Sequence, residues 1–220
     1  MARIVKNPFG ELSGKVGELV FKKGKNGAYI SMVPTPTKKK PSVLQERQRL
    51  KMTTVMDFLK PLKRLLQEAY VPFASQKSGF HAAKSYYLRE VVIPVNDSFT
   101  IDYPKALISF GDLRPATGVQ LTCLTTGRQP GSAPQEIRLS WTNNSDQAMA
   151  YGDDALIIVT HTPERSITNI RYDLAVRAEG EVTLQLGMYA TGAVTHVWLG
   201  FYRPHEQRAA MSTYAGSVVV

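Results

Sequence analysis

The stretch Val197-Trp198-Leu199-Gly200-Phe201 decides the fold class, because it contains four apolar side chains, one glycine and no polar residue. Successive side chains of a β-strand point to opposite faces of the sheet, so a strand without polar residues is buried on both faces. We therefore predict that these residues form the middle of a central strand covering residues 194–202. A central strand needs neighbours on both sides, and the flanking sequence provides them.

The C-terminal part of the chain contains short strand-like runs that alternate with turns. Residues 143–146 and 152–154 are two of these turns, rich in asparagine, aspartate and glycine. Short strands at such regular spacing predict an antiparallel immunoglobulin- or fibronectin-like β-sandwich. The expected strands cover residues 99–103, 106–109, 119–125, 136–142, 155–160, 169–174, 181–186, 194–202 and 213–220.

A β-hairpin is predicted near the N-terminus. Residues 19–23 and 28–33 have the composition of strands and flank Gly24-Lys25-Asn26-Gly27. Asn-Gly is the preferred pair for a two-residue hairpin turn, because both turn residues need positive φ. Residues 34–41 contain three prolines, which remove backbone donors and exclude regular structure there.

Helices are predicted after the proline-rich segment. Between residues 44 and 69, apolar side chains recur at helical spacing, starting with Leu44 and Leu50, and this stripe is expected to face a core. Pro61 interrupts the pattern, so we expect a kink or a new helix there. A further helix is expected over residues 80–92. The chain as a whole is therefore expected to have an α+β fold.

The basic residues concentrate in the N-terminal part of the chain. The chain has 27 Lys and Arg against 18 Asp and Glu, a formal net charge of +9. Residues 1–95 contain 18 basic and 6 acidic side chains, whereas residues 96–220 contain 9 and 12. Such a shift indicates two modules with different surfaces. We therefore predict a basic hairpin-plus-helices module over residues 1–95 and a β-sandwich domain over residues 96–220.

The basic side chains of the first module are the candidate binding residues for an anionic partner. Clustered lysines and arginines neutralise phosphates and release counterions, so nucleic acid is one such partner. An acidic protein surface is another, and a basic face that meets only solvent is the third interpretation. The nine candidates are Lys15, Lys22, Lys23, Lys25, Lys38, Lys39, Lys40, Arg47 and Arg49.

Two groups of residues carry a resemblance to a known family. The C-terminal group is residues 139–145 with residues 154–157. The N-terminal group is Gly14-Lys15-Val16-Gly17, Val20, Pro34, Pro41-Ser42, Gln45, Gln48-Arg49, Phe58-Leu59, Pro61-Leu62, Ala83 and Ser85-Tyr86. In order and spacing they resemble an uncharacterised family of Bacteroidota proteins, a domain of unknown function. The resemblance spans nearly the whole chain and implies a source and a domain order but no chemistry. The sequence departs from the family pattern at residues 22–27, where that pattern is less basic.

Motifs for catalysis or cofactor binding are weak. Residues 10–16 resemble a phosphate-binding loop, but the spacer has three residues instead of four and Val16 replaces the magnesium-binding hydroxyl. The four histidines are not spaced as metal ligands, and Asp153-Asp154 is better explained by a turn than by a calcium site. The single cysteine, Cys123, excludes a disulfide within the chain and is expected to be buried rather than nucleophilic. We expect no catalytic residue, no metal and no cofactor, and therefore no enzyme.

The sequence gives no prediction of secretion or membrane insertion. Residues 1–14 lack the apolar region and the cleavage site of a signal peptide. The longest apolar run has about five residues, whereas a membrane-spanning helix needs about 20. We therefore expect a location in the cytoplasm or in a virion.

Two functions from different classes fit these observations. The first is a non-enzymatic interaction or assembly protein, structural or adaptor, whose basic module docks on a protein partner or on another copy; an origin in a phage or mobile element would suit it. The second is a DNA- or RNA-binding protein that acts through the basic module. Basic clusters that share one concave face would favour nucleic acid, whereas scattered clusters would favour assembly.

Overall fold

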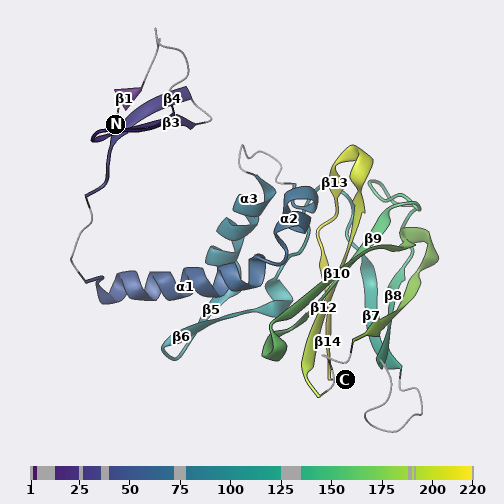
Figure 1. Ribbon diagram of the computed structural model, residues 1–220. Helices are drawn as coiled ribbons and strands as arrows, with labels where there is room; N and C mark the ends of the chain where they lie inside the picture. The colour runs from purple at the N-terminus through teal and green to yellow at the C-terminus, as the bar shows by residue number, and fades with distance from the viewer. Residues whose placement is uncertain are drawn as a thin grey trace. The chain divides into compact units, whose positions relative to one another are not determined.

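The structure is a computed structural model, and it describes residues 2–3, 13–24, 27–35, 40–71, 78–124, 135–187, 190 and 192–219. The chain divides into two compact units (Figure 1), residues 1–42 and residues 43–220. Helices and several antiparallel sheets are both present, so the expected mixed α+β class is confirmed.

The first unit contains a small antiparallel sheet. Its strands lie in the order β1 (Ala2–Arg3), β4 (Gly27–Met32), β3 (Leu19–Gly24) and β2 (Gly14–Val16). The expected hairpin corresponds to β3 and β4, with Gly24 opposite Gly27. The turn residues 25 and 26 lie outside the described part of the chain. The sequence analysis did not predict β1 and β2, which are shorter than the strands that pattern analysis detects.

The helices belong to the second unit. They are α1 (Val43–Leu59), α2 (Lys63–Ala69) and α3 (Gly79–Tyr86), which continues into the π-helical turn η1 (Tyr87–Val91). The break between α1 and α2 lies at Pro61, as predicted. The predicted apolar stripe is buried from Val55 onward. Leu44 and Leu50 are exposed, which contradicts the expectation that they face a core.

Two antiparallel sheets make up most of the second unit. The central sheet contains β10 (Ile167–Val176), β9 (Ala155–Thr162), β12 (Val194–Arg203) and β13 (Arg208–Ala209) in that order, and β14 (Thr213–Val219) also pairs with β12. The outer sheet has the order β11 (Glu181–Leu186), β8 (Gln135–Thr142) and β7 (Thr117–Leu124). These strands agree with seven of the nine predicted runs. Residues 106–109 form no strand, and the run at 99–103 belongs to a separate hairpin.

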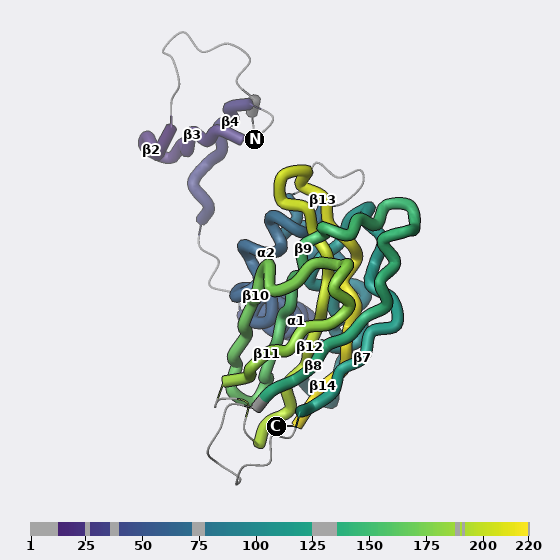
Figure 2. Tube along the Cα trace, turned by 90° about the vertical axis from the view of Figure 1, so that its right-hand side faces the viewer, coloured from purple at the N-terminus to yellow at the C-terminus, as the bar shows by residue number. Residues whose placement is uncertain are grey.

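The central sheet is covered on both faces. On one face, Ile157, Val159 and Trp198 share a core with the helices. On the other face, residues such as Leu199 and Phe201 share a second core with the outer sheet. Figures 1 and 2 show this succession of helices, central sheet and outer sheet. Because both faces are buried, β12 carries the continuous apolar run from which its central position was predicted.

The structure moves the expected domain boundary from residues 95/96 to residues 42/43. The hairpin of β5 (Val92–Val95) and β6 (Ser98–Ile101) spans the expected boundary, with Val95 opposite Ser98. The helices pack on the central sheet and share its core, so they cannot be separated from the strands. A stripe of apolar residues shows that a helix is buried on one side, but it does not show which surface covers that side.

The charge asymmetry persists at the new boundary. Residues 1–42 contain nine Lys or Arg against two Asp or Glu, whereas residues 43–220 contain 18 against 16. The first unit is therefore strongly cationic and the second is close to neutral.

Cys123 is exposed, which contradicts the expectation of a buried residue. It lies one residue before the end of β7, and β7 is an edge strand of the outer sheet. An apolar strand pattern predicts a buried face only where an opposing layer extends far enough to cover it.

Candidate interaction surface

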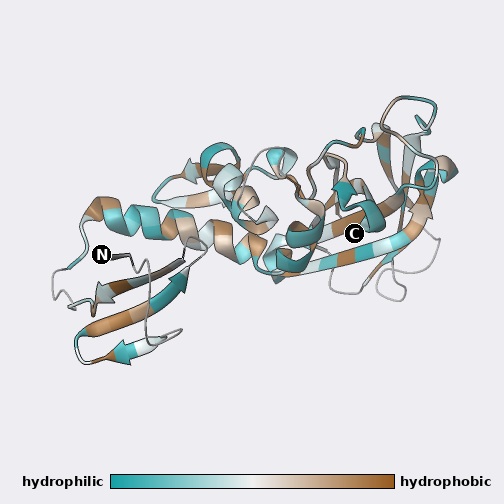
Figure 3. Cartoon of the chain, turned by 90° about the horizontal axis from the view of Figure 1, so that it is seen from above, coloured by the Kyte–Doolittle hydropathy of each residue, from teal (hydrophilic) through white to brown (hydrophobic). Residues whose placement is uncertain are grey.

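The sheet of the first unit has two chemically different faces. Strand alternation and register place Val16, Leu19, Phe21, Ile30 and Met32 on one side, which we call the apolar face. The other side, the basic face, carries Lys15, Lys22 and Tyr29 together with Val20 and Ser31. Figure 3 shows apolar and polar residues side by side on the strands of this unit.

The apolar face lacks a covering layer within the described part of its unit. Val16 is 67% exposed and Met32 is 70% exposed, while Phe21 and Ile30 are half-buried. Among residues 13–24, 27–35 and 40–42, none is buried. Antiparallel sheets commonly have one solvated face, but the other face normally packs on a core. This sheet is therefore a candidate docking element.

The basic face combines cationic side chains with an aromatic ring. Lys22 lies directly opposite Tyr29 on the neighbouring strand, and Lys15 follows on the next strand, opposite Val20. A Cβ on Gly24 would lie 3.3 Å from the ring of Tyr29, so glycine leaves room for this ring. Lysines beside an aromatic ring are typical of surfaces that contact phosphates and bases.

The remaining candidates do not join this face in the described part of the chain. The side chain of Lys23 lies on the side of the apolar face, opposite Ala28. Lys40 is exposed and follows the sheet in the sequence. Lys25, Lys38 and Lys39 lie outside the described residues.

Arg47 and Arg49 belong to the other unit. They lie on the first half of α1, where no residue before Val55 is buried. The guanidinium carbon of Arg47 is 5.7 Å from the centre of the Phe99 ring on β6, a cation–π distance. The structure therefore divides the described candidates over two faces of one sheet, the segment after that sheet and a helix of the second unit.

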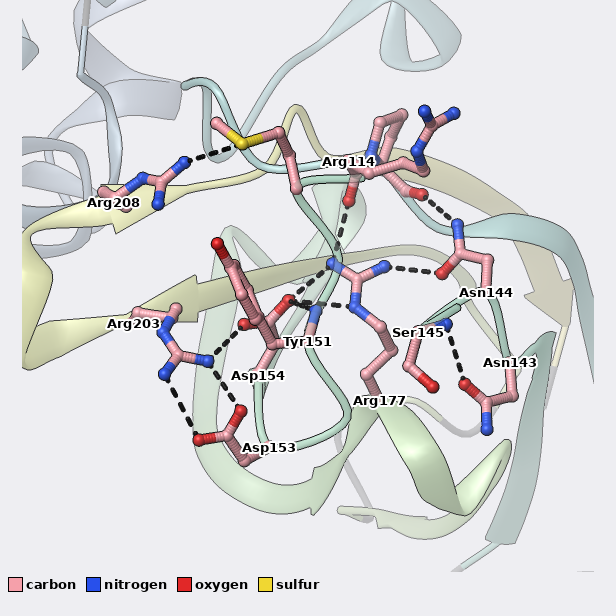
Figure 4. A network of polar contacts seen from close by, with 12 residues as sticks. Arg114, Asn143, Asn144, Ser145, Tyr151, Asp153, Asp154, Arg177, Arg203 and Arg208 are labelled. Atoms are coloured by element: carbon pink, nitrogen blue, oxygen red, sulfur yellow. Dashed lines mark hydrogen bonds and ion pairs between the residues drawn. The ribbon is translucent and has the colours of Figure 1, made fainter. Parts of the chain in front are cut away.

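A buried polar network, which the sequence analysis did not single out, joins loops of the second unit (Figure 4). Arg177 is fully buried, and its Nε donates to Asp154 Oδ2 at 2.9 Å. Its Nη1 donates to Asn144 Oδ1 at 2.7 Å, and its Nη2 donates to the Arg114 carbonyl at 2.8 Å. The guanidinium lies 4.0 Å from the centre of the Phe201 ring. These contacts tie the segment before β7 to the ends of β8, β9 and β10.

A second arginine, Arg203, forms ion pairs with the neighbouring carboxylates. Arg203 Nη1 donates to Asp153 Oδ1 at 2.6 Å and to Asp154 Oδ1 at 3.1 Å. Its Nε donates to Glu206 Oε1 at 2.8 Å. The hydrogen bonds from Arg203 lower the pKa of Asp153 below its ordinary value. Residues 152 and 153 form a turn, as predicted, and both carboxylates serve ion pairs with arginine.

The second unit also contains an aromatic cavity beside a pair of histidines. His161 on β9 and His196 on β12 lie directly opposite each other. His161 Nδ1 is 2.9 Å from Thr168 Oγ1, and His196 Nδ1 is 2.8 Å from the Tyr214 hydroxyl. Burial, with a smaller effect of His196, lowers the pKa of His161 to about 4. His161 is therefore neutral at physiological pH.

The described residues contain neither a metal-binding cluster nor a membrane-spanning helix. In these ranges no group of three or more His, Cys, Asp or Glu side chains could hold a metal ion. None of the helices described here is long and apolar enough to cross a membrane.

Comparison with known proteins gives a family and distant structural likenesses. The sequence profile of DUF6266, a family of unknown function, matches residues 11–216. Among solved structures, the chain is similar to the fn3 domain of the human collagen alpha-1(XX) chain, with a TM-score of 0.30 and 12% identity. That match covers 51% of this chain and 87% of the other. No curated protein matches the sequence. Because the family profile spans nearly all of the sequence, this chain belongs to the family of unknown function DUF6266.

Proposed function

We propose that this chain is a non-enzymatic assembly protein that docks through the apolar face of its N-terminal sheet. The proposal rests on the exposure of that face. Val16 and Met32 are mostly exposed, and none of the described residues between 13 and 35 is buried. A small sheet gains independent stability when its apolar face packs against a second layer. Docking on a partner would provide that layer.

The occupant that we assign to this face is the same face of a second copy. Leu19 lies opposite Met32 and Phe21 lies opposite Ile30, so two stacked faces would bring apolar pairs together. Sheets that pack in this way lie about 10 Å apart. Lys15 and Lys22 point to the other side, so stacking leaves their charges in solvent. The face is small, and we expect a dissociation constant of about micromolar order.

The test is light scattering after size-exclusion chromatography of the full chain over a range of concentrations. One variant combines Val16→Thr with Met32→Thr, which keeps strand-forming residues but removes exposed apolar surface. The matched control combines Lys15→Thr with Lys22→Thr on the basic face. We expect the wild type and the control to form oligomers, and the apolar-face variant to be monomeric at the same concentrations.

Salt gives a second criterion for assembly. The first unit carries nine basic and two acidic side chains, so two copies repel each other. Screening of this repulsion should strengthen self-association as the salt concentration rises. A wild-type chain that is monomeric at every concentration, or an apolar-face variant that assembles like the wild type, would overturn the proposal.

Nucleic-acid binding is the second candidate function, and the basic face favours it. Lys22 beside Tyr29, with Lys15 on the next strand, combines a phosphate contact with a stacking surface. Nucleic-acid binding should weaken steeply between about 50 mM and 200 mM salt, because the binding of lysines to phosphates releases counterions. The same two variants separate the functions: the basic-face variant should lose DNA or RNA binding, and the apolar-face variant should keep it.

The second unit would serve as the rigid body of such an assembly protein. Its central and outer sheets pack face to face around one core, which supports our assignment of an immunoglobulin- or fibronectin-like sandwich. A structural protein of this kind would suit a phage or mobile element of Bacteroidota. The genes next to this one test that origin, since structural genes of a phage cluster together.

A further inference from the structure

The hairpin of β5 and β6 is a sheet of two strands in the described part of the chain. It lies beside α1 in the second unit (Figure 1), and Ile101 at the end of β6 belongs to the core that the helices share. Each strand therefore has an outer edge, whose backbone groups do not pair with the other strand. A two-stranded sheet gains stability when a third strand is added. The hydrogen-bond pattern distinguishes the two edges.

This pattern places the backbone groups of Phe99 and Ile101 on the outer edge of β6. Asp102 N donates to the Val91 carbonyl at 2.9 Å, and this pair extends the hairpin register by one step. Hydrogen-bonded and non-hydrogen-bonded pairs alternate along antiparallel strands, so the pairs that contain Phe99 and Ile101 are non-hydrogen-bonded. The N–H and C=O groups of these two residues therefore point away from β5. No hydrogen bond joins these groups to another residue of the described ranges.

The outer edge of β5 is blocked by a proline. Pro94 lies opposite Phe99, so its nitrogen occupies a position from which an N–H group would point outward. A proline on an edge strand is a common protection against the addition of another strand. The sequence of β6 contains no proline, and Phe99 and Ile101 each contribute an outward donor and an outward acceptor. The hairpin is therefore open on the β6 side.

A cavity lies along this open edge. Its volume is about 640 Å³, and three consecutive residues of β6, residues 99–101, line it. Consecutive side chains of a strand point to opposite faces, so a cavity lined by all three lies beside the strand and not over one of its faces. The other walls come from residues 54–61 and from residues 161–168, around the turn between β9 and β10. The β6 edge therefore faces a space that is bounded by elements of one compact unit.

The lining of this cavity is apolar below and polar at the rim. The side chains of Phe58 and Ile101 are buried, whereas those of Asp57 and Lys60 are largely exposed. A strand added to β6 would turn alternate side chains towards Phe58 and Ile101 and the others away from them. Apolar residues that alternate with polar residues fit this environment.

One cation beside the edge has no ion pair in the described part of the chain. The guanidinium of Arg47 lies 5.7 Å from the centre of the Phe99 ring, and no described carboxylate pairs with it. Lys60, by contrast, is paired with Asp57 at 3.2 Å. A carboxylate on the added strand, at the end next to Phe99, would complement Arg47 and fix the register of the strand.

We propose that the edge of β6 binds a short extended segment of a partner protein, which adds a third strand to the hairpin. The segment would exchange backbone hydrogen bonds with Phe99 and Ile101. Its apolar side chains would enter the cavity, and an acidic residue would meet Arg47. In strand addition the main-chain hydrogen bonds provide affinity, and the pockets for alternate side chains provide specificity.

The test is fluorescence anisotropy of labelled five-residue peptides that are titrated with the full chain. The probes are acetyl-Thr-Val-Thr-Val-Asp-amide and acetyl-Asp-Val-Thr-Val-Thr-amide, because the added strand can run in either direction along β6. We expect one of them to bind with a dissociation constant of about 100 µM or lower. The same peptide with Lys in place of Asp should bind about tenfold more weakly, because the lysine would meet the charge of Arg47.

N-methylation of the peptide separates strand addition from other kinds of peptide binding. In an added strand, every second N–H group points to β6 and the others point to solvent. Methylation of one alternate set of peptide nitrogens should abolish binding, and methylation of the other set should leave it unchanged. Hydrogen exchange gives the matching result on the protein, where the amides of Phe99 and Ile101 should gain protection when the peptide binds.

Two variants at one position locate the site. Phe99→Pro removes an outward N–H group without removing a hydrogen bond to β5, as Pro94 does on the other strand. Phe99→Val is the matched control, because it keeps the N–H group and a strand-forming side chain but also lacks the ring beside Arg47. We expect Phe99→Pro to bind the peptide about tenfold more weakly than Phe99→Val does. Urea unfolding, followed by the fluorescence of Trp141 and Trp198, shows whether both variants are folded.

Several outcomes would overturn the proposal. If neither peptide binds, or if methylation of either alternate set weakens binding equally, the peptide is not added as a strand. If Phe99→Pro is folded and binds like Phe99→Val, the peptide binds elsewhere. If Phe99→Pro without peptide loses oligomers that Phe99→Val forms, the occupant is a second copy and not a different protein. The peptide titrations do not involve the N-terminal sheet, so their failure leaves the proposed assembly function untouched.

Discussion

The N-terminal sheet exposes apolar side chains, whereas the central sheet buries them on both faces. In the first unit, Val16 and Met32 are mostly exposed and no described residue is buried. In the second unit, β9 and β12 are buried on both faces, by helices on one side and by the outer sheet on the other. The difference teaches that the described part of the second unit contains layers on both faces of its central sheet, whereas the described part of the first unit contains a single layer.

The largest loss of stability is expected for a substitution of Arg177, the buried arginine of the second unit. Arg177→Met should remove the closer of the two arginine partners of buried Asp154 and the hydrogen bond that Arg177 donates to Asn144. We expect the free energy of unfolding, measured with urea, to fall by about 3–5 kcal/mol. Arg171→Met is the matched control, because Arg171 is exposed on β10. A loss below about 1 kcal/mol for Arg177→Met would show that the interior does not depend on this network.

The packing of the helices gives the next largest effect. A Cβ on Gly79 would lie 2.2 Å from the Leu66 carbonyl oxygen and 2.3 Å from that of Tyr70, so Gly79→Ala forces α2 and α3 apart. We expect a loss of about 1–3 kcal/mol in urea unfolding. Gly152→Ala is the control, since its Cβ would make an ordinary contact of 3.5 Å with Ala178. Equal stability of the two variants would contradict the close packing of these helices.

Acid should weaken the second unit through His161. Burial lowers the pKa of His161 to about 4, below the unfolded value of 6.5, so the unfolded state binds more protons as the pH falls below 6.5. After allowance for partial solvent access, we expect His161 to account for about 1 kcal/mol of the stability lost between pH 7 and pH 5. His161→Gln should reduce this pH dependence, measured as the urea unfolding free energy at pH 7 and pH 5. If stability depends on pH in His161→Gln as it does in the wild type, the acid sensitivity does not come from His161.

The smallest effect is expected for the exposed apolar face. Val16→Thr with Met32→Thr should change the urea unfolding of the second unit by less than about 0.5 kcal/mol, because exposed side chains contribute little to stability. The probe is the fluorescence of Trp141 and Trp198, which both lie in the second unit. A larger effect would mean that the two units stabilise each other.

Local patterns in the sequence predicted most of the strands and helices. Asn26-Gly27 indicated the pairing of β3 with β4, Pro61 indicated the break between α1 and α2, and the run from Val197 to Phe201 indicated a central strand. In each case neighbouring residues determine the backbone geometry. Long-range packing was harder to predict. The helices were assigned to the wrong side of the boundary, because their apolar stripe does not identify its partner.

The candidate sites show the same limit. The hydrogen-bond partners of Arg177 lie 23, 33 and 63 residues away in the sequence, so no local motif reveals this network. Asn144 and Asp154 belong to the residues that carry the family resemblance, and this was the available hint. The nine basic candidates were chosen by charge alone. The division of Lys22 and Lys23 between two faces follows from the alternation of side chains along β3, which a choice by charge alone does not take into account.

Hydrogen–deuterium exchange of the full chain, measured over a series of dilutions, tests the central claim most directly. We predict that backbone amides of β3 and β4 exchange fast when dilute and become protected as the concentration rises, while amides of β9 and β12 stay protected throughout. Protection of β3 and β4 that equals that of β9 at every dilution would contradict the claim that this sheet obtains its second layer from another copy.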